Sequence, residues 1–213
     1  LRCETIDVRG ATVFSVRLIA TSKLLVTCEQ SAMLLATMVR VNEARTWLAA
    51  EAMALPVCDR KSKFALQKAF YTELRARFGL SSQMAVRAIA NVAACFKTEP
   101  TVQHEFRDKA AITYDDRILT FKGASGETPT AVTVATLDGR IALPIVAGGP
   151  HRERLAGERG ESDLVLRKGR WYLHTSVTLP DVVERPVVSF LGADFGIINL
   201  ATDSDGERYS GSA

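Results

Sequence analysis

The sequence predicts an α+β protein: an antiparallel, barrel-like sheet with an inserted three-helix bundle, followed by the first strands of a second domain. Apolar residues recur every three or four positions in 27–98, the period of an amphipathic helix. After Pro100 the period becomes two, as in half-buried strands. One strand-like stretch, 11–26, precedes the helices without a neighbouring partner, so we expect it to join the later sheet.

The first strand and the first helix follow from two local patterns. In "ATVFSVRLIAT" apolar and polar residues alternate, which predicts a strand around residues 13–19. Thr27 and Gln30 then have the spacing of a capping box at the start of a helix. Pro56 is expected to end that helix at about residue 55. The apolar positions of this helix are Met33, Leu34, Met38, Val41, Trp47 and Leu48.

Two further helices complete the predicted bundle over 27–98. The second covers about residues 61–77 and is ended by Gly79. Ser81 or Ser82 caps the third, which reaches about residue 97. The expected buried face of the third helix comprises Ala85, Ala88, Ile89, Val92 and Phe96, and Gln83, Arg87 and Asn91 lie on its other side.

The sheet is predicted from short strands and tight turns. "AITY" and "RILTF" are predicted as two strands joined across "DD". "TAVTVATLDGRIALPIV" predicts a hairpin with its turn at Asp138-Gly139, and "DLVLRKGRWYLHTSVTL" a second with its turn at Lys168-Gly169. Together with the first strand, these elements predict a small barrel or curled sheet built from residues 11–26 and 101–185.

A new element begins near Pro186, in "PVVSFLGADFGIINLATDSDGERYS". We expect a strand that ends near Asp194, a turn at Gly196, a strand over about 198–202 and a turn at Asp205-Gly206. An acid in an apolar run between glycines is expected to be buried. A ribonuclease H-like fold begins in this way, with an acid that binds Mg²⁺. A sugar kinase or actin-type ATPase begins similarly, and an acid that accepts hydrogen bonds from a turn is a third interpretation.

"GADFGIINLATDSDG" resembles the first RuvC motif of the transposon-encoded TnpB family and of the related type V CRISPR effectors. In that family, G-x-D-x-G-x-x-N-L-A-T precedes a "DG" turn. Upstream segments are similar to the family in the same order: "RLIAT", "TCEQSAMLLATMVRVNEARTWLA", "FYTELRARFGLSSQMAVRAIANVAACFK", "ITYDDRILTF", "TLDGRIALPIV" and "DLVLRKGRWYLHTSVTLP". The resemblance covers nearly the whole chain, and its specificity lies in the ordered set of segments.

The resemblance implies the N-terminal part of an RNA-guided DNA endonuclease. Residues 11–26 and 101–185 would form its wedge domain, 27–98 its recognition domain, and 186–213 the start of its RuvC nuclease domain. The partners would be a guide RNA and a target DNA carrying an adjacent motif. Asp194 would be a catalytic residue and a ligand of Mg²⁺ in the full-length protein.

The later acids of the RuvC site and the zinc-binding cysteine pairs of that family do not occur in this sequence. We therefore expect that this chain, a fragment of the longer protein, does not cut DNA alone. A nuclease-inactive, RNA-guided DNA-binding repressor is the alternative.

Candidate nucleic-acid contacts come from the second helix and the second hairpin. Lys61, Lys68 and Arg75 share a helix face, next to a stripe formed by Phe64, Tyr71 and Phe78. Alternatively, these aromatic rings belong to the core and the cations are ordinary surface charges. The predicted contacts are Lys61, Lys68, Tyr71, Arg75, Arg87, Arg167, Lys168 and Arg170. Arg152, Arg154 and Arg159 are weaker candidates, because Glu153, Glu158 and Glu161 dilute their charge.

The amino-acid composition restricts the class of protein only broadly. The 213 residues are 47% hydrophobic and 24% charged, which is ordinary for a globular protein and argues against disorder. A net charge of +3 permits nucleic-acid binding without indicating it. Four scattered cysteines predict reduced thiols, and no stretch reaches the length of a membrane span. We expect a prokaryotic cytoplasmic, nucleoid-associated protein with no membrane partner; the sequence gives no oligomeric state.

Overall fold

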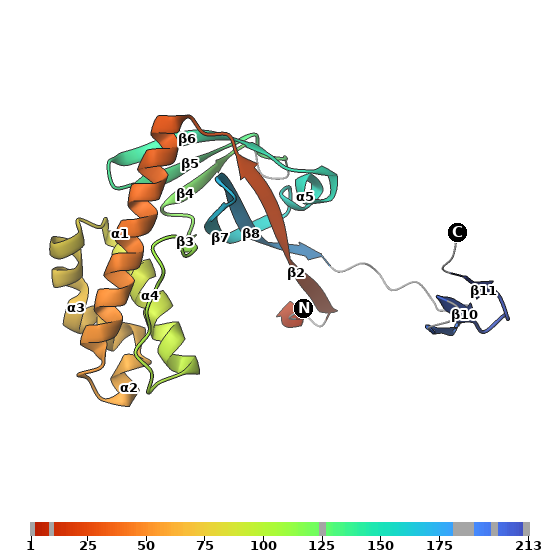
Figure 1. Cartoon of the computed structure of the whole chain (residues 1–213), viewed down its shortest axis with the longest axis horizontal. Helices are drawn as coiled ribbons and strands as arrows, with labels where there is room; N and C mark the ends of the chain where they lie inside the picture. Colours follow the sequence, from red (N-terminus) through yellow and green to blue (C-terminus); the bar gives the residue numbers. More distant parts are fainter. Residues whose placement is uncertain (1–2, 9–10, 124–126, 181–189, 197–199, 211–213) are drawn as a thin grey trace. The chain divides into compact units, whose positions relative to one another are not determined.

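The computed structural model describes residues 3–8, 11–123, 127–180, 190–196 and 200–210 (Figure 1). The chain forms two compact units, Leu1–Pro180 and Asp181–Ala213. The first unit confirms the predicted α+β class, with helices and a nearly closed, antiparallel, barrel-like sheet. Helices α1 to α4 lie between strands β2 and β3 in the sequence. None of the described helices is long and apolar enough to cross a membrane.

The sheet is centred on β2 (Ala11–Leu24), the strand that the sequence left without a neighbour. It pairs with β8 (Arg170–Pro180) over nine residues, which confirms that it joins the later strands. The strand order is β3-β7-β8-β2-β6-β5-β4, with β1 (Cys3–Val8) added on β2. The other strands are β3 (Ile112–Tyr114), β4 (Leu119–Lys122), β5 (Ala131–Thr136), β6 (Gly139–Val146) and β7 (Glu158–Arg167).

Strands β3 and β4 follow each other in sequence but lie at the two ends of this order. One hydrogen bond links the two ends: the Tyr114 hydroxyl of β3 donates to the carbonyl of Ala135 on β5 (3.1 Å), the strand next to β4. This contact brings the sheet close to a closed barrel.

The second predicted hairpin turn is confirmed and the first is displaced by one residue. Lys168 and Gly169 both have positive φ (50° and 71°), as a type I′ turn requires. In the β5–β6 hairpin the turn residues are Leu137 and Asp138, and Gly139 (φ 119°) is already the first residue of β6. Leucine disfavours positive φ, so the glycine follows the turn instead of forming its second corner.

Helix α1 (Cys28–Ala52) begins with the predicted capping box. The Thr27 hydroxyl accepts from the Gln30 N–H (3.2 Å), and the Gln30 side chain accepts from the Thr27 N–H (3.0 Å). The expected extension to residue 55 is wrong, because the chain turns after Ala52. The four-residue helix α2 (Val57–Arg60) follows Pro56, and the Arg60 guanidinium donates to the freed carbonyls of Met53 (2.7 Å) and Leu55 (2.9 Å).

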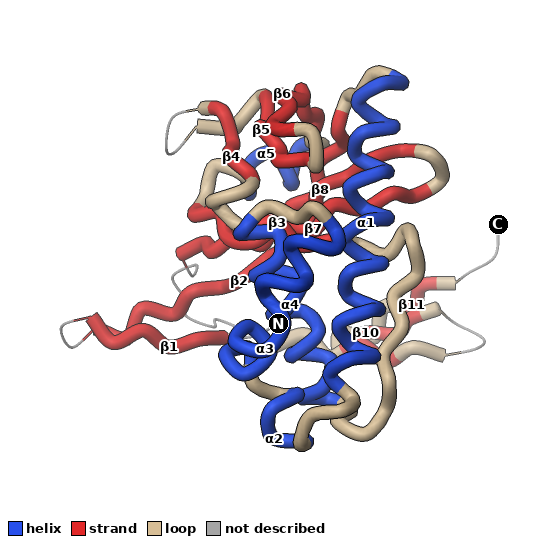
Figure 2. Tube along the Cα trace, turned by 90° about the vertical axis from the view of Figure 1, so that its left-hand side faces the viewer, coloured by secondary structure: helices blue, strands red, loops and turns tan. Residues whose placement is uncertain are grey.

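Helices α3 (Lys63–Phe78) and α4 (Ser82–Thr98) lie close to the predicted ranges. Gly79 ends α3 with φ 65°, and Ser81 caps α4 through the Met84 N–H (3.4 Å). Helices α1, α3 and α4 contact one another, and α1 also reaches β3 and β5 of the sheet (Figures 1 and 2). All five residues predicted for the apolar face of α4 are buried: Ala85, Ala88, Ile89, Val92 and Phe96.

The short helix α5 (Gly149–Arg154) covers part of one edge of β2. Strand β6 pairs with β2 only at Lys23 and Leu24. Further along this edge, the His151 Nδ1 accepts from the Thr21 N–H (3.3 Å) and Arg154 donates to the Ile19 carbonyl (3.4 Å). Side chains of α5 therefore satisfy backbone groups that have no strand partner there.

The second unit contains a three-stranded antiparallel sheet in the order β11-β10-β9. Its strands are β9 (Ala193–Asp194), β10 (Ala201–Asp203) and β11 (Arg208–Tyr209). Asp203 holds the turn between β10 and β11, since its carboxylate accepts from the N–H groups of Asp205 (3.1 Å) and Glu207 (2.9 Å). The proposed boundary at Pro186 and part of the second strand, 198–199, lie outside the described residues. Several apolar side chains of this unit are exposed: Phe190, Leu191, Phe195, Leu200 and Tyr209.

Candidate nucleic-acid interface

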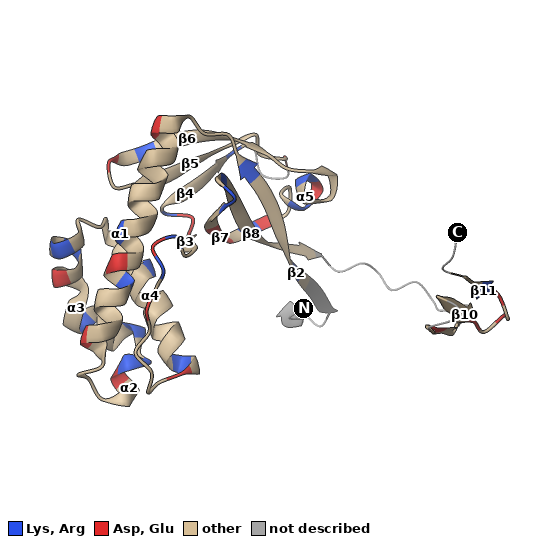
Figure 3. Cartoon of the chain, viewed as in Figure 1, with Lys and Arg blue, Asp and Glu red and all other residues tan. Residues whose placement is uncertain are grey.

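The predicted site residues occupy four places in the structure, and lysines and arginines are spread over helices and sheet (Figure 3). One group lies on α2 and α3, a second is Arg87 on α4, a third lies at the β7–β8 turn, and Asp194 lies on β9 of the second unit.

Most of the first group lies on one face of α3, on which Phe64, Lys68 and Arg75 are exposed and Tyr71 is half-buried. Phe64, Lys68, Tyr71 and Arg75 follow one another at intervals of four, three and four residues, so they share one side of α3. The Phe64 side chain is 81% exposed. The Arg75 guanidinium lies 5.6 Å from the centre of the Tyr71 ring, a cation–π distance. A hydrogen bond with Ser82, together with nearby Arg75, lowers the pKa of Tyr71 below its usual value. Lys61 lies before α3, at the end of α2, so the prediction that it shares a helix face with Lys68 and Arg75 is wrong. We call Phe64, Lys68, Tyr71 and Arg75 the α3 face.

Phe78 differs from Phe64, the first residue of the predicted aromatic stripe. Its ring packs against Trp47 of α1 at 5.7 Å, and Trp47 also contacts Phe70 at 6.1 Å. The interpretation of the aromatic stripe as core therefore holds for Phe78, holds in part for Tyr71, which is half-buried against the core, and is wrong for Phe64. Phe64 can offer a ring to a ligand, whereas Phe78 holds α3 against α1.

Arg87 lies where α4 meets the sheet. Its guanidinium forms an ion pair with Glu161 of β7 (2.6 Å), and its side chain is only 15% exposed. On the same side of α4, Gln83 donates to Asp115, and Asn91 accepts from Arg45 (2.7 Å). The stripe that the sequence placed opposite the apolar face thus contacts polar groups of the sheet and of α1. This geometry makes Arg87 a connection between helix and sheet.

The third group brings the cations of the β7–β8 turn together in one cavity. Arg167, Lys168 and Arg170 are exposed and line a cavity of about 600 Å³. Tyr172 and His174 of β8 continue the lining along the sheet, and Thr21 and Val165 complete it. A cluster of cations next to an aromatic ring suits a phosphate backbone with unpaired bases.

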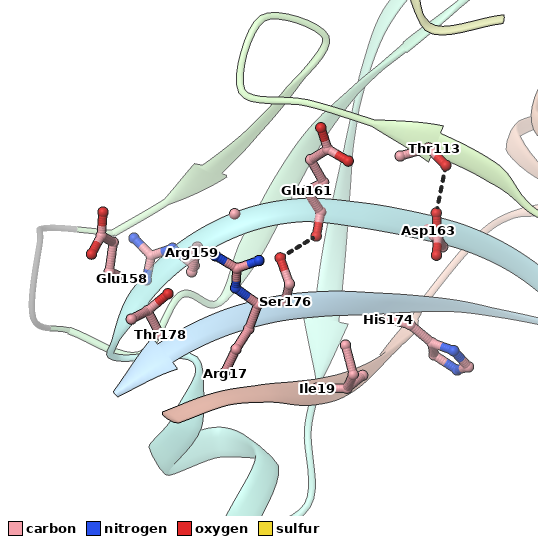
Figure 4. Close-up of a pocket in the computed structure, with 11 residues that line it drawn as sticks. Arg17, Ile19, Thr113, Glu158, Arg159, Glu161, Asp163, His174, Ser176 and Thr178 are labelled. Atoms are coloured by element: carbon pink, nitrogen blue, oxygen red, sulfur yellow. Dashed lines mark hydrogen bonds between the residues drawn. The ribbon is translucent and has the colours of Figure 1, made fainter. Parts of the chain in front are cut away.

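A second cavity of about 570 Å³ adjoins the first at His174, which lines both (Figure 4). The strand register aligns Thr113, Asp163, His174 and Thr21 in one row across β3, β7, β8 and β2. The Thr113 hydroxyl donates to the Asp163 carboxylate (2.7 Å). Further residues of this cavity are Arg17, Ile19, Glu158, Arg159, Gly160, Glu161, Ser176 and Thr178. We call the two cavities together the outer groove.

The sequence predictions missed Tyr172, His174 and Asp163. The available signal was the alternation along β8, where buried Trp171 and Leu173 flank Tyr172 and point to the other face of the sheet. Alternation shows which residues share a face, but only the register shows that Asp163 lies directly opposite His174.

Asp194 lies at the end of β9, opposite Thr202 of β10. Its side chain is exposed, so the expected burial of this acid is wrong. The strands of this sheet are only two or three residues long and cover little surface, and the neighbouring Phe195 is also 80% exposed. Across the part of the chain that the structure describes, no three His, Cys, Asp or Glu side chains are grouped as a metal site.

No protein-family model matches the chain, and no curated protein matches it.

Proposed function

We propose that this chain is the nucleic-acid-binding, N-terminal part of a TnpB-like, RNA-guided DNA endonuclease. The observation that carries the proposal is the outer groove, in which Arg167, Lys168 and Arg170 of one hairpin lie beside Tyr172 on the barrel-like sheet. In this account the sheet is the wedge domain, and α1, α3 and α4 form the bundle of an inserted recognition domain. The order of strand, helices and sheet along the chain supports it.

Two surfaces would share the binding. At the outer groove, the cations would neutralise phosphates of the guide RNA and release their counterions. At the α3 face, Lys68 and Arg75 would contact phosphates while Phe64 and Tyr71 stack on unpaired bases of the RNA or of the target DNA. Arg87 is not part of either surface, because Glu161 already neutralises it.

Residues 190–210 would be the start of the RuvC domain, with Asp194 as the first acid of a Mg²⁺ site. The carboxylate is exposed at a strand end and can reach a cation. Bound Mg²⁺ would supply charge stabilisation for phosphodiester hydrolysis, and the remaining ligands would come from later parts of the full-length protein.

Two measurements test the proposal. A labelled single-stranded RNA titrated with the chain should bind with an affinity that falls steeply as salt rises; the absence of salt-dependent binding would contradict the nucleic-acid role. In the full-length protein, Asp194→Ala should abolish cleavage of target DNA and retain RNA binding, whereas the control Asp205→Ala should cleave normally. Undiminished cleavage by Asp194→Ala would remove the metal-ligand role.

A nuclease-inactive, RNA-guided repressor is the second candidate. Like the first candidate, it would bind nucleic acid through the cations and the tyrosine of the outer groove, and it requires no metal at Asp194. It predicts that the full-length protein binds guide RNA and target DNA and leaves the DNA intact with or without Asp194.

A further inference from the structure

We propose that the outer groove selects RNA over DNA, holding phosphates at its hairpin end and a ribose 2′-hydroxyl at the row of Asp163 and His174. This inference rests on the proposed function and names the ligand chemistry of the same groove.

The first argument is the change of charge along the groove. The hairpin end carries Arg167, Lys168 and Arg170. The other cavity contains Glu158, Glu161 and Asp163 together with Arg17 and Arg159, and Glu161 is paired with Arg87. The two arginines lie opposite Thr178 and Val177 of β8, so Asp163 is the charged group in the row of His174. Arg170 and His174 are four residues apart on β8, which is about 13 Å along a strand. A single strand can therefore place phosphates at the cationic end and a different group at the row of Asp163. Repulsion between like charges disfavours a phosphate directly next to the Asp163 carboxylate.

The second argument is the set of hydrogen-bonding groups in the Asp163 row. Thr113 donates to one oxygen of the Asp163 carboxylate (2.7 Å), which fixes the group and leaves further lone pairs open. His174 lies directly opposite on β8 and can donate or accept through its ring. The strand register places both residues on the same face of the sheet, and Figure 4 shows Ile19 next to His174. A 2′-hydroxyl donates and accepts at once, so it fits between a carboxylate acceptor and an imidazole, and deoxyribose cannot replace it.

Asp163 also has a structural role that the test must separate from recognition. Its charge stabilises the nearby guanidinium of Arg45, which is buried between α1, α4 and the segment before β3. A variant of Asp163 can therefore lose stability as well as selectivity. For this reason the main comparison changes the nucleic acid and keeps the protein intact.

The experiment measures binding of the full chain to three labelled 12-nucleotide single strands of the same base sequence: RNA, 2′-O-methyl RNA and DNA. We expect RNA to bind about tenfold more tightly than DNA, the effect of one or two hydrogen bonds. The 2′-O-methyl strand, which keeps the ribose but cannot donate, should bind like DNA.

Protein variants locate the effect. Asp163→Asn should reduce the RNA preference to less than about threefold, with DNA affinity unchanged or raised because a negative charge is removed. Glu153→Gln on α5 removes the same charge outside the groove and should keep the tenfold preference. The double variant Arg167→Glu, Arg170→Glu should bind RNA, 2′-O-methyl RNA and DNA more weakly, each by a similar factor.

The outcomes separate this inference from the proposed function. The inference would be overturned by equal affinities for RNA and DNA. It would also be overturned by an RNA preference that remains both with the 2′-O-methyl strand and in the Asp163→Asn variant. In either case, salt-dependent binding would still support the proposed function. If none of the three strands shows salt-dependent binding, both are wrong.

Discussion

Arg87 of α4 and Glu161 of β7 form an ion pair of 2.6 Å at the place where the helices meet the sheet. The contact between Gln83 and Asp115 lies on the same side of α4. Close by, buried Arg45 donates to the Ala111 carbonyl (2.8 Å) in the segment that leads into β3. Charged and polar side chains thus fix the orientation of the helices relative to the sheet.

Removal of the Arg87 side chain should destabilise the protein measurably. Since Arg87 is only 15% exposed, Arg87→Ala is expected to lower the free energy of unfolding by about 1–2 kcal/mol. The matched control is Arg40→Ala, which breaks the exposed pair of Arg40 with Glu43 (3.3 Å) and should cost less than about 0.5 kcal/mol. Urea unfolding measures both; equal losses would mean that the Arg87 pair does not stabilise the junction.

Arg45 should matter more, because it is 3% exposed and its guanidinium connects three parts of the chain. It donates to Asn42 (3.1 Å), Asn91 (2.7 Å) and the Ala111 carbonyl (2.8 Å). Arg45→Met keeps much of the volume but leaves these acceptors without a donor, so we expect a loss of about 3 kcal/mol or more. A loss below about 1 kcal/mol in urea unfolding would show that the network contributes little.

The hydroxyl of Tyr114 should make the protein sensitive to alkaline pH. Burial raises the pKa of Tyr114 above its usual value of 10, so the folded chain keeps a proton that the unfolded chain loses. Its contribution to stability is therefore complete below pH 10 and falls as pH rises further. Arg45 acts in the opposite direction, because burial lowers its pKa to about 10 and the unfolded chain holds that proton longer.

Tyr114→Phe isolates the tyrosine contribution, since Arg45 is present in both proteins. At pH 7 the variant should lose about 1 kcal/mol, the value of the hydrogen bond to the Ala135 carbonyl. Between pH 10 and pH 11.5 the difference in the free energy of unfolding between the parent and Tyr114→Phe should become smaller. Thermal unfolding across this range measures it, and a gap that stays constant with pH would refute the account.

The variants Phe64→Ala and Phe78→Ala should affect different properties: the first nucleic-acid affinity, the second the stability of the fold. Phe64→Ala removes an exposed ring, so unfolding should change by less than about 0.5 kcal/mol while RNA or DNA affinity falls by a factor of about 5 to 100. Phe78→Ala removes the contact with Trp47 and should destabilise the chain by about 2 kcal/mol. If Phe64→Ala binds nucleic acid like the parent, the α3 face is not a stacking surface.

Local signals in the sequence predicted most of the elements. The Thr27 capping box, the Gly79 end of α3 and the Lys168-Gly169 turn each depend on a few neighbouring residues, and all three are confirmed. The four-residue helix α2 was missed because it is held by a tertiary contact, from Arg60 to the carbonyls of Met53 and Leu55.

The candidate site was less accessible to prediction. Arg167, Lys168 and Arg170 were found because they are adjacent in sequence. The contribution of Asp163 and Thr113 to the outer groove depends on the pairing of β3 with β7, which no local pattern specifies. Arg87 has the helical position of an exposed residue, and only the packing of α4 on the sheet places Glu161 next to it.

The most direct test of the central claim is the salt dependence of RNA binding by the parent chain and by the double variant Arg167→Glu, Arg170→Glu. The account predicts that the double variant binds at least about tenfold more weakly at moderate salt, and that its plot of log affinity against log salt is less steep by about 2. The control Arg107→Glu, Lys109→Glu makes the same charge change in the loop before β3 and should behave like the parent. An unchanged affinity and slope in the groove variant would contradict the assignment of the outer groove as a nucleic-acid interface.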